Sequence, residues 1–332
     1  MGTFDYLKNF SFLFAGYYIF RSRRLLLISY KTLTTIAIIC VIVAVSQEIL
    51  FLLGKISAPT ALIRFGLMRT PSLLGHPNLY GLYIFLVFTI RLFLKRKIDF
   101  LNILFLIGIF LSISRFVWIS TIFILFVYTM NFGKFFYKFA FLFLFIGFSF
   151  FSLPYFLLHT SHELLTQNFF RGYALYKSIE IWNDNKILGV GPGMFGGVVS
   201  IIFNSPIYYK YDFSYHWFNF MKNFNSIDQF YPQLLAETGI LGFLSFIYIL
   251  FILFKNPRII YKKRTRYDFF SNFIYSLSWV PLGLILYLFG SGLNMVAFLI
   301  PYFLLLGISI GVVKNAYPTR KQISFSKRWR RH

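Results

Sequence analysis

Long hydrophobic segments, separated by short polar ones, fill most of this 332-residue chain. A helix needs about 20 apolar residues to cross the hydrocarbon core of a membrane. By this measure the pattern predicts eight transmembrane helices, near residues 33–53, 78–94, 98–112, 114–130, 139–158, 233–254, 270–290 and 293–313. One long polar and aromatic stretch, residues 159–232, interrupts the series. We therefore expect an all-α polytopic membrane protein in which one large extracytoplasmic loop carries short helices.

The N-terminal region leaves the number of spans open. Residues 4–20 form a shorter apolar stretch with Asp5 and Lys8 near its start, which is either a ninth, thin span or an interfacial helix. The expected organisation is an N-terminal segment, transmembrane helices on both sides of the large loop, and a basic tail. In chain order these are residues 1–32, 33–158, 159–232, 233–313 and 314–332.

Composition supports the membrane class and removes several others. The chain is 58% hydrophobic and only 13% charged, which excludes a soluble core of this length. Its one cysteine, Cys40, lies within a predicted span, so disulfides and thiolate metal sites are excluded. Near His159, His162 and Glu163 no further residues complete a zinc ligand set, and no metal or cofactor is expected.

The distribution of basic residues predicts the orientation. The net charge of +23 raises the question of nucleic acid, but 23 of the 33 Lys and Arg residues fall in the segment before the first span, in alternate connections between spans and in the tail. Short cytoplasmic loops are enriched in Lys and Arg, so these segments and the C-terminus are expected in the cytoplasm. The long loop then faces outward. No soluble module remains to bind nucleic acid.

Several polar residues are predicted on the outer face, where positive charge is otherwise depleted. They are Arg64, Arg69, His76, Asn78, Arg115, Arg171 and Asp228. Taken alone, Arg115 is explained as well by a structural role as by ligand binding, because a guanidinium at the end of a span can reach the lipid headgroups. The planar guanidinium pairs well with phosphate oxygens, so two or three arginines can clamp a polyphosphate. The set predicts an anionic ligand outside the membrane.

The long loop opens with a helix and a glycine-rich turn. Arg171, Leu175, Ser178 and Trp182 recur at helical spacing, and the glycines of residues 189–193 then end that helix. This turn lacks the Lys-Ser/Thr of a phosphate-binding P-loop, which favours a structural role. Five aromatic residues further along are candidates for stacking on sugar rings: Tyr208, Tyr209, Tyr211, Tyr215 and Trp217.

Four motifs, in order, carry a family resemblance. They are RFGLMRTPSLLGHPNLYG at 64–81, SRFVWIS at 114–120, RGYALYKSIEIWNDNKILGVGPGMFGG at 171–197 and DQFYPQLLAETGILG at 228–242. In this the chain resembles the O-antigen polymerase and ligase superfamily of bacterial envelope enzymes. The resemblance implies an inverting, metal-independent sugar transfer from undecaprenyl-pyrophosphate-linked oligosaccharides, outside the inner membrane.

The resemblance also assigns expected roles to residues. Arg115 and Arg171 would bind the pyrophosphate, and Asp228 would serve in catalysis. Asn78 and Glu237 would support them as substrate-binding residues in matching motifs. From their predicted place outside the membrane, and not from the resemblance, Arg64, Arg69 and His216 are further substrate-binding candidates. Membrane lipids and a chain-length regulator are expected partners.

One departure from the family pattern favours the polymerase branch. Ligases usually have a histidine where this chain has Asp228, which Gln229 follows. Either Asp228 or His216 is then the general base. Each also has an ordinary alternative, because Asp228 can cap the following helix and His216 can pack among aromatic rings.

Three functions remain open. The first is a polymerase of repeat units, the second a ligase that moves finished glycan to another acceptor, and the third a transporter or flippase of lipid-linked sugars. A transporter is expected to show internal repeats, of which none is visible, and to carry charge in the middle of its spans. In this chain Glu48, Arg115 and Glu237 lie near the outer ends.

Overall fold

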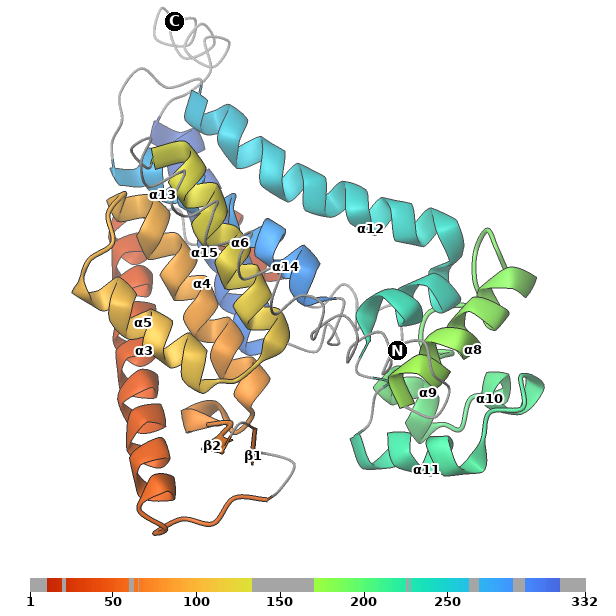
Figure 1. The fold of residues 1–332 in the computed structure, drawn as a ribbon. Helices are drawn as coiled ribbons and strands as arrows, with labels where there is room; N and C mark the ends of the chain where they lie inside the picture. The colour runs from red at the N-terminus through yellow and green to blue at the C-terminus, as the bar shows by residue number, and fades with distance from the viewer. Residues whose placement is uncertain are drawn as a thin grey trace, which may run out of the picture. The chain divides into compact units, whose positions relative to one another are not determined.

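The computed structural model describes residues 11–19, 22–59, 63–64, 66–132, 170–224, 227, 229–262, 269–288 and 296–316. These residues fall into two compact units (Figure 1). Among the described residues, those within 115–254 and 281–288 belong to unit 1, and those within 11–114, 255–280 and 296–316 belong to unit 2. The predicted span at 139–158 lies outside the described residues.

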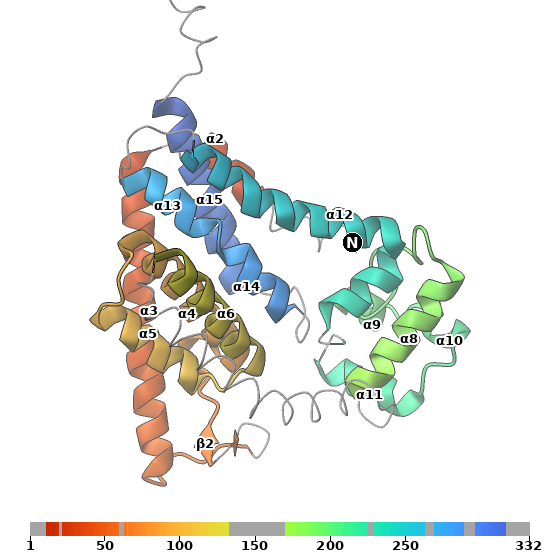
Figure 2. The same ribbon diagram turned by 45° about the horizontal axis from the view of Figure 1, so that its top comes forward.

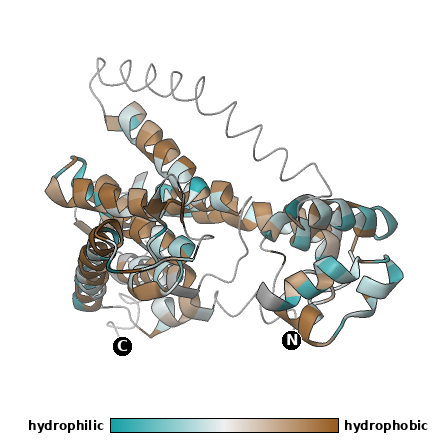
Figure 3. Cartoon of the chain, turned by 60° about the horizontal axis from the view of Figure 1, so that its bottom comes forward, coloured by the Kyte–Doolittle hydropathy of each residue, from teal (hydrophilic) through white to brown (hydrophobic). Residues whose placement is uncertain are grey.

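The described residues confirm an all-α polytopic membrane protein. Five segments are long and apolar enough to cross a membrane: α3 (Arg23–Leu52), α4 (Pro77–Lys95), α6 (Arg115–Phe132), α12 (Phe230–Lys262) and the pair α13 (Phe269–Leu277) and α14 (Val280–Tyr287). Two further apolar stretches are α5 (Phe100–Leu111) and residues Phe298–Val312 of α15 (Val296–Ala316). Figure 3 shows hydrophobic residues along these helices.

The first long helix starts earlier than predicted. α3 begins at Arg23, whereas the sequence placed its start near residue 33, because no glycine or proline interrupts residues 23–52 and arginine and leucine are good helix formers. At 1.5 Å per residue, a 30-residue helix is about 45 Å long, which exceeds the roughly 30 Å of the hydrocarbon core. Its basic first turns therefore extend beyond the core. There the guanidinium of Arg23 lies 5.1 Å from the ring centre of Phe270.

Unit 2 is a helix bundle around α4. Helices α3, α5, α13 and α15 pack against one another and around α4 (Figures 1 and 2). In α4, 83% of the apolar stretch that could span a membrane is buried. Of residues 4–20 the structure describes 11–19, which contain the 8-residue helix α2 (Ser11–Tyr18); this helix packs on α15. A Cβ on Gly16 would lie 2.5 Å from the carbonyl oxygen of Leu304, so this glycine permits the close approach.

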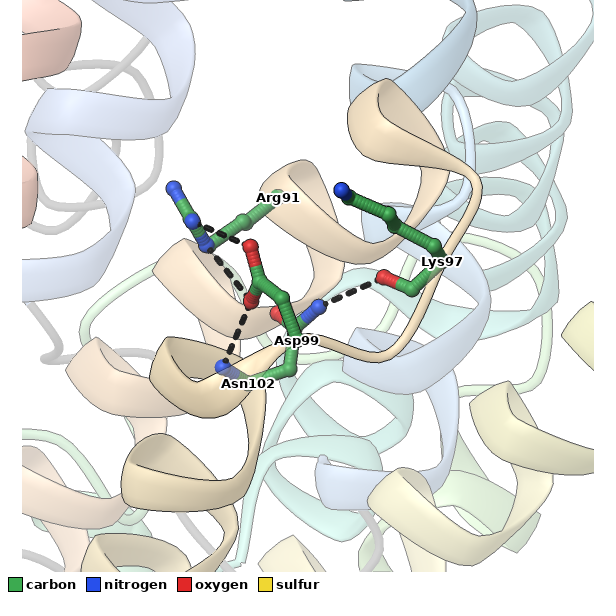
Figure 4. Close-up of polar contacts among 4 residues, drawn as sticks. All are labelled: Arg91, Lys97, Asp99 and Asn102. Atoms are coloured by element: carbon green, nitrogen blue, oxygen red, sulfur yellow. Dashed lines mark hydrogen bonds and ion pairs between the residues drawn. The ribbon is translucent and has the colours of Figure 1, made fainter.

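An ion pair closes the turn between α4 and α5 (Figure 4). Arg91 donates hydrogen bonds to Asp99 from Nη2 at 2.5 Å and from Nε at 3.3 Å. Asp99 also accepts from the backbone N–H of Asn102 at 3.1 Å, and Asn102 donates to the carbonyl of Lys97 at 2.9 Å. Burial alone would raise the pKa of Asp99, but the hydrogen bonds from Arg91 and Asn102 lower it below its usual value. The carboxylate thus stays charged and fixes the basic turn.

The segment between α3 and α4 folds back along α3 instead of forming a simple loop. It contains the antiparallel pair β1 (Ile63–Arg64) and β2 (Leu67–Met68) and the short helix η3 (Ser72–Leu74). The N–H groups of Met68 and Ser72 donate to Glu48 and Gln47 at 3.2 and 3.0 Å. The Ser72 hydroxyl also reaches the carbonyl of Cys40 at 2.6 Å. Non-helical backbone at membrane depth requires such internal partners.

In unit 1, helix α12 is broken at Gly239. This residue has φ 61° and ψ −164°, a conformation open essentially to glycine alone. The residues beside the break find partners in the glycine loop, which we define as residues 185–197. The carbonyls of Ala236 and Glu237 accept from Val190 and Gly191 at 3.0 and 2.9 Å.

The other side of the break is satisfied by the same loop. The N–H groups of Ile240 and Leu241 donate to the carbonyls of Lys186 and Ile187 at 2.9 and 3.3 Å. Backbone groups at a helix end otherwise lack partners, and such orphans are costly away from water. The glycine loop and the break in α12 therefore form one structural unit.

We predict that Gly239→Ala prevents this unit from forming. A Cβ there would lie 2.4 Å from the carbonyl oxygen of Ile187, in addition to the backbone strain. Gly54→Ala is the matched control, because Gly54 has φ 67° with nothing within 4 Å of the added carbon. The free energy of unfolding of the control should fall by only about 1–2 kcal/mol. Gly239→Ala should yield little folded protein in detergent size-exclusion and thermal unfolding assays. Equal behaviour of the two variants would contradict the packing argument.

Candidate functional site

The described part of the predicted outer loop forms a compact loop module, residues 170–224. It contains α8 (Phe170–Asp184), α9 (Val198–Ile202), α10 (Pro206–Lys210) and α11 (Tyr215–Phe224), which gather around the start of α12 (Figure 1). Their shared core consists of Ala174, Ile181, Phe195, Ile201, Ile207, Tyr208, Tyr211, Met221, Ile227 and Ala236. The loop module thus shares a hydrophobic core with Ile227 and with Ala236 of α12, and this core fixes its helices.

Glu237 is buried at the centre of this arrangement. It has 0% exposure, and its Oε1 accepts hydrogen bonds from the N–H groups of Gly193 and Phe195 at 2.9 and 3.0 Å. A carboxylate that accepts two backbone N–H bonds is held firmly in place. The sequence suggested substrate binding by Glu237, which stays a prediction; in the structure its Oε1 is bonded to the glycine loop.

Tyr208 holds the other end of the glycine loop. Its hydroxyl accepts from the N–H of Gly196 at 2.9 Å and lies 2.8 Å from the hydroxyl of Ser200. Burial raises the pKa of Tyr208 to about 12, and the nearby charge of Glu237 acts in the same direction. The tyrosine therefore remains neutral.

The aromatic residues proposed to stack on sugars divide into two groups. Tyr208 and Tyr211 are 4% and 6% exposed and belong to the core, so they are not accessible to a sugar. Tyr209 and Tyr215 are 73% and 80% exposed and remain candidates. Trp217 packs on Phe170, with ring centres 5.7 Å apart.

Arg171 is carried by the first turn of α8. The adjacent Phe170 packs on Trp217 and Phe220 of α11, and Tyr173 accepts a hydrogen bond from the N–H of Ser214 at 2.7 Å. These contacts fix the helix start, while Arg171 itself is half-buried. The first turn of a helix favours anions, because its N–H groups and dipole present positive charge.

Arg115 lies at the start of another helix of unit 1. It is the first residue of α6 and is half-buried. The turn before it contains Ile113 at φ 43° and the buried Ser112 and Ser114. The hydroxyl of Ser120 donates to the carbonyl of Gly283 at 2.9 Å and links α6 to α14. Arg115 is thus the first described residue of α6, and Arg171 is the second described residue of α8.

The structure brings together two of the predicted residues of unit 2. Arg69 donates from Nη2 to the side-chain oxygen of Asn78 at 3.0 Å. His76 caps α4 and accepts from the N–H of Asn78 through Nδ1 at 3.2 Å. Arg64 lies in β1, and its side chain is outside the described residues.

Of the two candidate bases, Asp228 and His216, the structure describes only His216. Asp228 lies outside the described residues, as do His159, His162 and Glu163. His216 is exposed on α11, and its ring centre lies 4.8 Å from that of Trp217. Among the described residues, no group of three or more His, Cys, Asp and Glu side chains is placed to hold a metal ion.

Sequence reasoning missed the polar contacts that support the module. Lys177 donates to Glu180 at 2.9 Å and to the carbonyl of Tyr211 at 2.6 Å, which joins α8 to the end of α10. The hydroxyl of Tyr211 donates to Asp184 at 3.0 Å. The spacing of Lys177 and Glu180 was a usable local signal, but the partners across the module share no sequence pattern.

Comparison with known protein families gives a match. Residues 100–247 match the family described as O-antigen ligase. The matched region contains Arg115, Arg171 and Glu237, and it confirms the predicted resemblance to the O-antigen polymerase and ligase superfamily. No curated protein and no solved structure matches the chain.

We predict that Glu237→Ala destabilises the protein while Glu237→Gln is milder. Alanine leaves two buried N–H donors without an acceptor, so the free energy of unfolding of Glu237→Ala should fall by about 3 kcal/mol. Glutamine retains an acceptor oxygen in a similar position, so Glu237→Gln should lose less stability. Glu180→Ala is the control for loss of charge, because that side chain is 40% exposed and its ion pair contributes little. The measurement is thermal unfolding of purified protein. Wild-type stability in Glu237→Ala would instead favour a direct role in substrate binding.

Proposed function

We propose that the protein is a polysaccharide polymerase of the outer face of the bacterial inner membrane. It transfers glycan from an undecaprenyl-pyrophosphate donor to a lipid-linked repeat unit. The observation that carries this proposal is the family match at residues 100–247, in a protein with several membrane-spanning helices. That match supports a membrane glycosyltransferase of lipid-linked oligosaccharides, in an O-antigen, capsule or exopolysaccharide pathway.

Arg115 and Arg171 bind the donor pyrophosphate in this proposal. Each lies in the first turn of a helix and is half-buried, so guanidinium and helix N–H groups add their positive charge. Negative charge develops on the leaving phosphate during transfer. Fixed positive groups in a partly dehydrated site can stabilise that charge by several kcal/mol, on the order of 3 for one good donor.

Other outer-face residues bind and orient the substrates. The hydrogen bond from Arg69 to Asn78 orients one guanidinium, and Arg64 adds a further cation for phosphate. Glu237 acts as a positioning residue, because it fixes the glycine loop that follows α8. The exposed Tyr209 and Tyr215 offer apolar ring faces to sugars.

The transfer step needs a base but no metal. The acceptor hydroxyl oxygen attacks the anomeric carbon from the face opposite the pyrophosphate, and the bond from that carbon to the phosphate oxygen breaks. The electron pair leaves with the pyrophosphate, and the hydroxyl proton passes to Asp228. His216 is the alternative base, and its exposed position leaves it accessible to an acceptor.

Asp228 and the following Gln229 favour polymerase over ligase, because ligases usually have a histidine in place of Asp228. Ligase activity is the second candidate, because the matching family is described by that name. A transporter or flippase of lipid-linked sugars is the third. The proposed topology places the C-terminus in the cytoplasm, and a chain-length regulator is a proposed partner.

We predict that Arg115→Ala and Arg171→Ala each abolish most polymer formation at normal protein abundance. The assay uses purified protein in proteoliposomes, supplied with undecaprenyl-pyrophosphate-linked repeats and EDTA, and measures product length by gel electrophoresis. Arg171→Lys should rescue poorly, because an ammonium cannot form two parallel bonds to phosphate. Lys210→Ala is the control, since it removes an exposed loop cation. Full activity in Arg171→Lys would contradict the clamp.

We predict that Asp228→Asn fails in the same assay. The amide retains the shape and the acceptor oxygen that a helix cap needs, but it does not take up a proton at neutral pH. If Asp228 only caps α12, Asn should serve nearly as well, because the two residues rank together as N-caps. Wild-type product length in this variant would remove Asp228 as the base and leave His216.

A further inference from the structure

The loop module exposes two large apolar residues at the point where it meets α12. Ile187 and Leu188, at the turn after α8, are 63% and 73% exposed. The carbonyls of Lys186 and Ile187 accept from the N–H groups of Ile240 and Leu241, which start the second part of α12. These hydrogen bonds place the apolar turn beside the first residues of a membrane-spanning helix segment.

The helix segment that follows exposes a row of large apolar side chains. Leu241, Leu244, Tyr248 and Phe251 are 52%, 56%, 64% and 49% exposed. Their spacing of three and four residues puts them along one side of the helix. Only 22% of the apolar stretch of α12 that could span a membrane is buried. The apolar turn at residues 187–188 thus continues this exposed apolar row.

The residues next to the turn are those of a membrane interface. Trp182 donates from its indole nitrogen to the carbonyl of Lys186 at 3.1 Å, and Lys186 is exposed. Tryptophan is enriched at the headgroup level, and lysine can keep its stem in apolar surroundings while its ammonium reaches water or phosphate. Hydrophobic residues also occur in the module as a whole (Figure 3), but this pair adjoins α12 through hydrogen bonds of the main chain.

We propose that the turn at residues 186–188 inserts into the outer leaflet and anchors the loop module to the bilayer. Ile187 and Leu188 enter the acyl region, and Trp182 and Lys186 lie at the headgroups. The anchor fixes the C-terminal end of α8, the helix whose first turn carries Arg171. The proposal rests on the membrane orientation and not on the transfer reaction, so it can fail while the proposed function stands.

The test is the collision of spin labels with oxygen, which dissolves in the bilayer, and with a nickel chelate, which stays in water. Labels are attached to Leu188→Cys, Leu244→Cys and Lys210→Cys in full-length protein in liposomes of phosphatidylethanolamine and phosphatidylglycerol. Leu244 supplies the lipid reference and Lys210, exposed on α10, the water reference. The native Cys40 is 0% exposed and stays in place. Ile187→Cys repeats the measurement if the Leu188 variant does not fold.

The proposal expects the ratio of oxygen to nickel collisions at residue 188 to be several-fold above that at residue 210 and close to that at residue 244. A ratio equal to that of residue 210 would overturn it. Protection from both agents would indicate a protein contact at the turn and would also overturn it. In intact spheroplasts, a membrane-impermeant maleimide should react with Lys210→Cys. No reaction there would place the module on the cytoplasmic side and overturn the assignment to the outer leaflet.

Discussion

The break in α12 at Gly239 depends on the glycine loop, and much of unit 1 depends on that contact. A helix interrupted near a membrane surface leaves carbonyl and N–H groups without partners on its two sides. Here four of these groups bond to residues 186–191, and the carboxylate of Glu237 bonds to two more N–H groups of the loop. The result is a fixed junction between a transmembrane helix and the module outside it.

This junction explains why the glycines are needed where they are. A Cβ on Gly189 would lie 2.5 Å from the carbonyl of Glu237, and one on Gly239 would lie 2.4 Å from the carbonyl of Ile187. The two main chains approach closely enough to bond only because neither has a side chain there. The proposed phosphate ligand Arg171 then lies on α8, which is held through this loop at one end and through aromatic contacts of Phe170 at the other.

The sequence predicted the class, the approximate spans and the ordered family motifs, because hydrophobic length and charge at span ends are local properties. Short-range glycine spacing also indicated a turn at residues 189–193. The sequence did not indicate that Glu237 would be buried or that residues 63–74 would fold back onto α3. Both features depend on partners far away in the chain. The early start of α3 at Arg23 was missed because span prediction follows hydropathy, whereas helices continue through charged residues.

The central claim, that the protein joins lipid-linked repeats into long chains, is tested most directly by the glycan of cells that lack it. The measurement is the length distribution of the glycan on undecaprenyl pyrophosphate and on its final acceptor, compared with a strain complemented by the wild-type gene. The polymerase account predicts only single repeats on the final acceptor. Long chains that accumulate on undecaprenyl pyrophosphate would contradict it and identify the protein as a ligase.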